Sequence, residues 1–168
     1  MKIKSMFTAI ASVIIYSNLC LAAGTAVPAC LDGGNLLGMN NNAVLGWKTS
    51  TKNQYHSRGH VQGTLVKVYP DHSGHHHYEV QIGANRNDTI EVIYNEQFGA
   101  VPQINPGTQM EACGDYITSN APTGQYPASP DGAIIHWVHQ SPNPRSHDSG
   151  YIVANGVVYG QNGSGTAP

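Results

Sequence analysis

Apolar and polar residues alternate through most of the chain after residue 59, and this period of two predicts β-strands. Within residues 76–83, Tyr78, Val80 and Ile82 fall on one face of a strand, and the polar residues between them fall on the other. Similar runs predict seven strands, at residues 60–70, 76–83, 89–95, 108–118, 133–139, 150–154 and 157–161. The dipeptide Asn155-Gly156 between the last two predicts a tight hairpin.

The order and spacing of these strands predict an all-β fold. The first five strands fit a small five-stranded barrel of the OB type, and the final pair adds a C-terminal hairpin. Residues 23–58 are rich in glycine and asparagine and predict an N-terminal arm, with a short helix or a packed segment over its weak apolar pattern. The barrel domain then spans residues 59–160, and residues 161–168 form a flexible tail.

The first 22 residues differ from the rest of the chain. Lys2 and Lys4 precede an apolar stretch over residues 6–16, and small residues follow near the predicted cleavage point. This pattern predicts a secretory signal peptide at residues 1–22, because the apolar stretch is too short for a transmembrane helix. We therefore expect an exported protein, periplasmic or extracellular, with no transmembrane segment once the signal is removed.

The charge of the chain excludes one class of partner. Removing Lys2 and Lys4 leaves six basic residues against ten acidic ones, which is a net charge of −4 with neutral histidines. Strong nucleic-acid binding requires clustered Lys and Arg side chains that displace counterions from phosphates. We expect no such binding, and the sequence leaves other partners and the choice between monomer and oligomer open.

Two cysteines, Cys30 and Cys113, remain after the predicted cleavage. An even number of cysteines in an exported chain favours a disulfide, with two buried free thiols as the alternative. The bond would close a loop of about 80 residues, which the entropy of loop closure values at about 4 kcal/mol.

Several short motifs occur in a fixed order along the chain. They are GTLVKVYPDHSGHHHY, then Tyr94-Asn95, CGDY, GAIIHWVHQSPNPRSHDSGYI and NGVVY, and they cover about residues 60–159. The chain resembles a bacterial family of short exported proteins, a domain of unknown function marked by a His-Trp-Thr-His motif. Tyr94 stands where the family pattern has a histidine, and Val138 stands where it has a threonine. The resemblance implies no activity, and a mechanism that needs those two family side chains would not apply here.

The sequence contains nine histidines, and most of them fall in two groups. One group lies at the first predicted hairpin, and the other begins at the end of the fifth predicted strand. Imidazole is a common ligand for zinc, copper and nickel, so these groups predict a site for a metal such as zinc, or for another ligand. The predicted metal ligands are His75, His77, His139 and His147, with Asp148 as an oxygen ligand.

Strand geometry separates two of the histidines. On a regular strand over residues 133–139, His136 points into the barrel and His139 points away from it. One metal ion could bind both only if the strand were bulged or ended near Trp137.

Two other functions fit the same residues. In a hydrolase of the nuclease or phosphodiesterase kind, His136 or His139 would act as the general base and Arg145 would hold a phosphate. In an oligosaccharide- or protein-binding module without chemistry, tyrosines on one sheet face would contact the ligand. In the simplest interpretation the histidines are structural, solvated at a hairpin or hydrogen-bonded inside the barrel.

Overall fold

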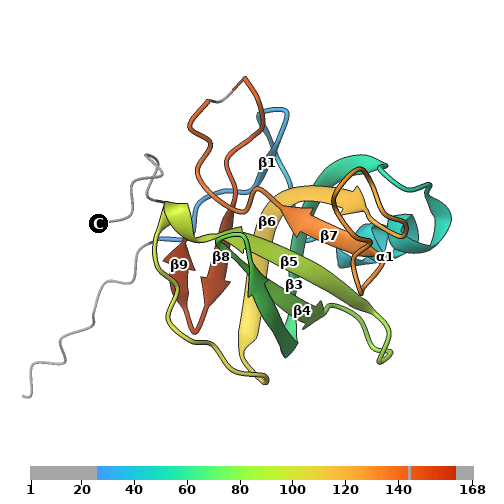
Figure 1. The fold of residues 1–168 in the computed structure, drawn as a ribbon. Helices are drawn as coiled ribbons and strands as arrows, with labels where there is room; N and C mark the ends of the chain where they lie inside the picture. The colour runs from blue at the N-terminus through green and yellow to red at the C-terminus, as the bar shows by residue number, and fades with distance from the viewer. Residues whose placement is uncertain (1–25, 144, 162–168) are drawn as a thin grey trace, which may run out of the picture.

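The computed structural model describes residues 26–143 and 145–161. The predicted signal peptide and residues 162–168 of the predicted tail lie outside the described residues. Figure 1 shows a curled arrangement of strands, with a short helix beside it. In chain order the elements are β1 (Leu31–Asp32), β2 (Asn35–Leu36), α1 (Asn41–Ser50), β3 (His56–His72), β4 (His75–Gln81), β5 (Thr89–Asn95), the 3-10 helix η1 (Glu96–Phe98), β6 (Gln109–Thr118), β7 (Ala133–His136), β8 (Tyr151–Ala154) and β9 (Val157–Tyr159).

Five of the strands pair in a ring. β3 pairs with β6 along its first half and with β4 along its second half, β4 pairs with β5, and β7 lies between β5 and β6. All these pairings are antiparallel except that of β5 with β7. The β8–β9 hairpin continues along β6 beyond the end of β7. The prediction of an all-β fold with a C-terminal hairpin is confirmed, although the ring is a curled sheet rather than a uniformly closed barrel, because only two residue pairs join β5 to β7.

Two tight turns connect neighbouring strands of this sheet. Ser73 and Gly74 join β3 to β4 with φ of 53° and 73°, and Asn155 and Gly156 join β8 to β9 with φ of 52° and 74°. Positive φ at both central residues is the geometry of a type I′ turn, whose twist matches that of the flanking strands. The hairpin predicted from Asn155-Gly156 is therefore confirmed.

Apolar side chains on the inner face of the ring form the main core. Tyr78, Val80 and Ile82 are buried there, as their alternation predicts. Further buried core residues come from β3, β5, β6, β7 and β8, among them Leu65, Ile90, Val92, Met110, Ile135 and Ile152. α1 packs against β3 and β6, with Val44 fully buried and the Trp47 ring centred 5.3 Å from that of Tyr116.

A disulfide ties the N-terminal arm to the ring. Cys30 and Cys113 are bonded, with their Cα atoms 5.7 Å apart, and this prediction is confirmed. The arm contains the small β1–β2 hairpin and α1, so the short helix is present. No helix in the described ranges is long and apolar enough to cross a membrane.

β7 is shorter than the sequence pattern predicts. It ends at His136 rather than at His139, because Trp137 has a left-handed backbone conformation with φ of 50°. Ala133 and Ile135 point into the core, so His136 lies half-buried on the opposite face, and the prediction that His136 points inward is wrong. The early strand end meets the condition under which His136 and His139 can belong to one site.

Candidate functional site

Five histidines gather where the start of β4, the end of β7 and the loop between β7 and β8 meet. This histidine cluster consists of His75, His77, His136, His139 and His147. The ring centroids of His75 and His136 are 5.9 Å apart, and those of His139 and His147 are 5.3 Å apart. The structure therefore brings the histidines of the first hairpin to those that end and follow β7.

Aromatic rings pack against the part of the cluster that follows β7. Phe98 lies flat against His139, with ring centroids 3.5 Å apart and an angle of 8° between the ring planes. The Trp137 ring lies next to both His136 and His147, at centroid distances of 4.7 and 5.7 Å. These contacts restrict the orientations that the imidazoles can adopt.

Backbone carbonyls select one tautomer at three of the histidines. The Nδ1 atoms of His75, His139 and His147 each lie 2.9 Å from a carbonyl oxygen within two residues along the chain. A carbonyl only accepts, so Nδ1 must donate, and the neutral ring then carries its lone pair on Nε2. Metal-binding histidines are commonly oriented in this way.

A carboxylate orients His77. Its Nδ1 lies 2.7 Å from Oε1 of the buried Glu91, and the second carboxylate oxygen of Glu91 accepts a hydrogen bond from the Ser129 hydroxyl at 2.5 Å. Among the described residues, Nε2 of His77 is the one buried side-chain nitrogen or oxygen atom without a hydrogen-bond partner. Such an unpaired atom costs about 1 to 3 kcal/mol.

Burial keeps two of the histidines neutral. Burial first, and then the neighbouring imidazoles led by His75, lower the pKa of His136 to about 4. Burial also lowers the pKa of His139, against the opposing effect of its hydrogen bond to the Gln140 carbonyl. Both rings therefore present lone pairs rather than charges at neutral pH.

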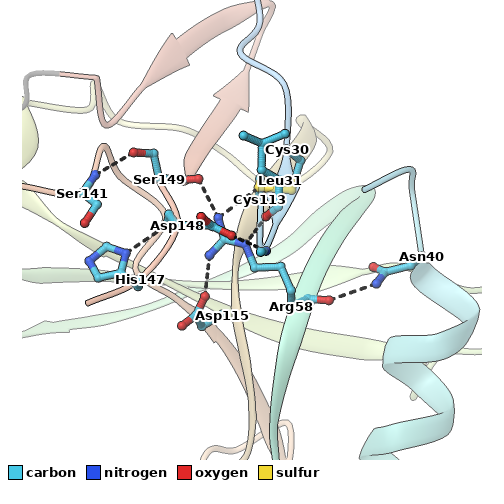
Figure 2. A network of polar contacts seen from close by, with 11 residues as sticks. Cys30, Leu31, Asn40, Arg58, Cys113, Asp115, Ser141, His147, Asp148 and Ser149 are labelled. Atoms are coloured by element: carbon cyan, nitrogen blue, oxygen red, sulfur yellow. Dashed lines mark hydrogen bonds and ion pairs between the residues drawn. A yellow bond between two sulfur atoms is a disulfide. The ribbon is translucent and has the colours of Figure 1, made fainter. Parts of the chain in front are cut away.

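A buried arginine holds the loop that carries His147. Arg58 donates hydrogen bonds to the carbonyl oxygens of Ser149 at 2.6 Å and of Leu31 at 3.0 Å. It also forms an ion pair with Asp115 (Figure 2). Arg58 therefore joins two strands of the ring to the arm and to the loop of the histidine cluster.

Two of the predicted site residues, Asp148 and Arg145, make their contacts outside the histidine cluster. Oδ2 of Asp148 accepts a hydrogen bond from the backbone N–H of Gly33 at 2.7 Å. Arg145 is exposed, and its backbone N–H donates to the side chain of Asn143. Asp148 thus fastens the loop to the arm, and Arg145 lies on the loop surface.

The most tightly spaced set of donor atoms lies outside the cluster. Of the described residues, one group of three has its ligand atoms within 4.8 Å of one another, namely Asp71, His76 and Glu96. His76 places Nδ1 3.0 Å from Asp71 and Nε2 3.2 Å from Glu96. Both ring nitrogens of His76 therefore face carboxylate oxygens. The donor atoms of the histidine cluster are spaced more widely in this conformation.

The hydrolase interpretation requires a histidine within hydrogen-bond reach of an orienting carboxylate. His136 and His139 have no such partner in the part of the chain that the structure describes, whereas His77 has Glu91. Glu91 and Ser129 were not predicted as site residues. A charged residue inside the apolar run TIEVIYN was the available signal for Glu91, and Ser129 lies in a proline-rich loop without any such signal.

A polar hollow of about 690 Å³ lies over β3, β4 and β5, and no member of the histidine cluster lines it. Among the residues that line it, the Tyr69 hydroxyl lies 3.1 Å from Glu79 and 3.2 Å from Asp131. Thr89 donates a further hydrogen bond to Asp131. Burial raises the pKa of Asp131.

The sequence matches a protein family. The family described as "Protein of unknown function (DUF3465)" matches over residues 47–160. The chain belongs to this family. The DUF3465 match includes every strand of the ring, the β8–β9 hairpin and the whole histidine cluster, while Cys30 lies before it. No curated protein and no solved structure matches the chain.

Proposed function

We propose that this protein is an exported, disulfide-bonded metal-binding protein whose site is the histidine cluster. The observation that carries the proposal is the gathering of five imidazoles from β4, the end of β7 and the following loop. In four of them Nδ1 is hydrogen-bonded to a carbonyl or carboxylate oxygen, which places the lone pair of the neutral ring on Nε2, where a metal ion could accept it. Neutral imidazoles without thiolates favour zinc, copper or nickel over calcium or magnesium.

The test is a titration of the exported chain, purified without an affinity tag and first stripped with a chelator. We expect one equivalent of Zn²⁺ or Cu²⁺ to bind, as measured by calorimetry and by metal analysis. Replacing all five histidines of the cluster by glutamine should abolish binding. His56→Gln changes a histidine at the start of β3, outside the cluster, and should have no effect. A wild-type chain that binds neither metal would contradict the proposal.

Export and domain organisation belong to the same proposal. We propose removal of residues 1–22 as a signal peptide, an arm at residues 23–58, an OB-like domain at residues 59–160 and a flexible tail at 161–168. The disulfide supports export, because such bonds persist in oxidising compartments. N-terminal sequencing of protein recovered from the periplasm and from the medium tests both the cleavage point and the location. Recovery of the intact N-terminus in the cytoplasm alone would overturn export.

A hydrolase is the second candidate, and one observation favours it. His77 has the buried, hydrogen-bonded carboxylate of Glu91 that a general base needs. Hydrolysis of a chromogenic ester or phosphodiester, lost in His77→Gln and retained in His56→Gln, would support this candidate. Equal rates for the wild type and His77→Gln would exclude His77 as a base for those substrates.

A further inference from the structure

We propose that His75, His77 and His136 form the metal-binding set of the histidine cluster, and that Glu91 and Ser129 are positioning residues for His77. This inference rests on the proposed function and names the ligands of that site. It assigns His139 and His147 to the surroundings of the metal rather than to its coordination sphere.

Strand register brings the three proposed ligands to one place. His77 pairs with Ile93 of β5 in register, and His75 pairs with Asn95. On the other side of β5, Val92 pairs with Ile135, so the next residues in the same parallel register are Ile93 and His136. Successive side chains alternate between faces, and Val92 and Ile135 are both buried, so the three histidines share the opposite face with Ile93.

The distance between strands fits a shared ligand. β4 and β7 flank β5, and neighbouring strands lie about 4.8 Å apart. Imidazoles that lean over Ile93 from both sides can therefore meet, and the rings of His75 and His136 already lie 5.9 Å apart between centroids. Side-chain rotations of the kind that commonly accompany binding would close the set.

His77 supplies the most specific indication of a missing partner. Its Nδ1 donates to Glu91, whose other carboxylate oxygen is held by Ser129. This chain of contacts fixes the ring and leaves the lone pair on Nε2, the buried atom without a hydrogen-bond partner. A carboxylate behind a metal-bound imidazole orients the ring and raises its basicity. A metal ion at Nε2 would provide the partner that this atom lacks.

The two remaining histidines are packed differently. Phe98 lies flat on His139 at 3.5 Å between ring centroids. The His147 ring contacts Trp137, and it lies nearly perpendicular to the His139 ring. Their rings are parts of an aromatic stack beside the three ligands. They would exclude solvent and limit the approach of other molecules to the metal.

Three imidazoles leave at least one coordination position for water or a small anion. Zinc sites with three protein ligands and one open position are typical of sites that bind or activate a small molecule, whereas structural zinc sites use four protein ligands. The proposed site therefore has an open coordination position. It binds Zn²⁺, Co²⁺ or Cu²⁺ together with one small exogenous ligand. Azide or cyanide, which bind open metal positions, are suitable probes.

The first experiment measures Zn²⁺ affinity and the Co²⁺ absorption spectrum of the full exported chain and its variants. Alanine substitution of His75, His77 or His136 should weaken binding at least about 100-fold. His76→Ala should stay within about threefold of the wild type, and His139→Ala and His147→Ala should weaken binding much less than the three ligand variants do. Azide should change the visible spectrum of the Co²⁺ form.

The second experiment tests the positioning residues. Glu91→Gln should weaken Zn²⁺ binding about 10- to 100-fold. Glu79→Gln is the matched control. Glu79 lies opposite Glu91 in the β4–β5 register, but its carboxylate accepts a hydrogen bond from the Tyr69 hydroxyl rather than from a histidine of the proposed set. Imidazole ¹⁵N spectra of the wild type should show a protonated Nδ1 on His77 before Zn²⁺ addition and a Zn²⁺-dependent shift of its Nε2. That readout needs no variant and is insensitive to a purely structural role of Glu91.

The outcomes separate this inference from the proposed function. Binding that survives His77→Ala but fails in His139→Ala and His147→Ala would overturn the ligand assignment and leave the metal-binding proposal in place. Loss of binding in His76→Ala alone would overturn the assignment in favour of the Asp71, His76 and Glu96 group. A wild-type chain that binds no metal would overturn both.

Discussion

Arg58 on β3 and Asp115 on β6 lie directly opposite each other in the strand register and form an ion pair in which the arginine is almost fully buried. The other N–H groups of the Arg58 guanidinium reach the carbonyl oxygens of Leu31 and Ser149. One side chain therefore joins the ring, the arm and the loop of the histidine cluster.

Arg58→Met should destabilise the protein by about 3 to 5 kcal/mol, because removing one partner leaves a carboxylate and two carbonyl oxygens without their donor. The free energy of unfolding, measured with urea, checks this expectation. Arg86→Met, on the exposed turn between β4 and β5, should change stability by less than about 0.5 kcal/mol. A loss below 1 kcal/mol in Arg58→Met would show that the network contributes little.

The disulfide should make stability depend on redox conditions. Cys30 and Cys113 are separated by 83 residues in sequence, and closing a loop of that length removes about 4 to 5 kcal/mol of entropy from the unfolded state. The double variant Cys30→Ala and Cys113→Ala should lose about that much stability, and a reductant should lower the Tm of the wild type but not that of the variant. Equal Tm values for oxidised and reduced wild type would contradict this.

Two glycines should respond in opposite directions to a methyl group. A Cβ at Gly150 would lie 2.3 Å from the carbonyl oxygen of Cys113 and 2.5 Å from that of Trp137, so Gly150→Ala should destabilise by about 1 to 3 kcal/mol or more. A Cβ at Gly46, inside α1, would have nothing within 4 Å. Gly46→Ala should therefore stabilise by about 0.5 to 1 kcal/mol through helix propensity. Thermal unfolding of the two variants checks both signs.

Asp131 should make stability fall as the pH rises. Burial raises the pKa of Asp131 in the folded state above its ordinary value of 3.8. The folded protein therefore binds the Asp131 proton more tightly than the unfolded chain does. By linkage, the contribution of Asp131 to stability is largest at low pH and is lost as the pH rises through the folded-state pKa. Protonated Asp131 also relieves the competition between Glu79 and Asp131 for the single Tyr69 proton.

The measurement compares the wild type with Asp131→Asn, which has no titrating group at this position. The stability of the wild type relative to the variant should decrease between pH 4 and pH 7 in urea unfolding experiments. A difference that stays constant over this range would contradict the expected shift. Asp88→Asn, on the turn after β4, controls for general charge effects.

Alternation of side chains was a reliable guide to the strands of the ring. The prediction for residues 89–95 coincides with β5, and Tyr78, Val80 and Ile82 are buried together. β3 extends two residues beyond Pro70, which lacks an N–H and ended the predicted strand. The structure accommodates this proline at a register irregularity between Tyr69 and His72.

The candidate site was harder to predict from the sequence than the strands were. A small barrel, as predicted from the sequence, could bring the histidines of the first hairpin close to those near the end of β7. The left-handed conformation of Trp137 depends on tertiary packing, and it decides the direction in which His139 leaves β7. The contact of His77 with Glu91 joins positions that are diagonal across β4 and β5. That contact requires the register of two strands, which an intervening turn of seven residues does not reveal.

The parallel pairing of β5 with β7 is the narrowest junction of the ring, and it joins strands that are distant in sequence. We expect this contact to form late in folding, because the long loop between β5 and β7 must close before the two strands can pair. It is also the place where the native protein should open first in hydrogen exchange. The proposed ligands lie on β4 and β7, on either side of this junction. A metal ion bound to these ligands would hold β4 and β7 together across the β5–β7 junction. Metal binding and closure of the ring would then be thermodynamically linked.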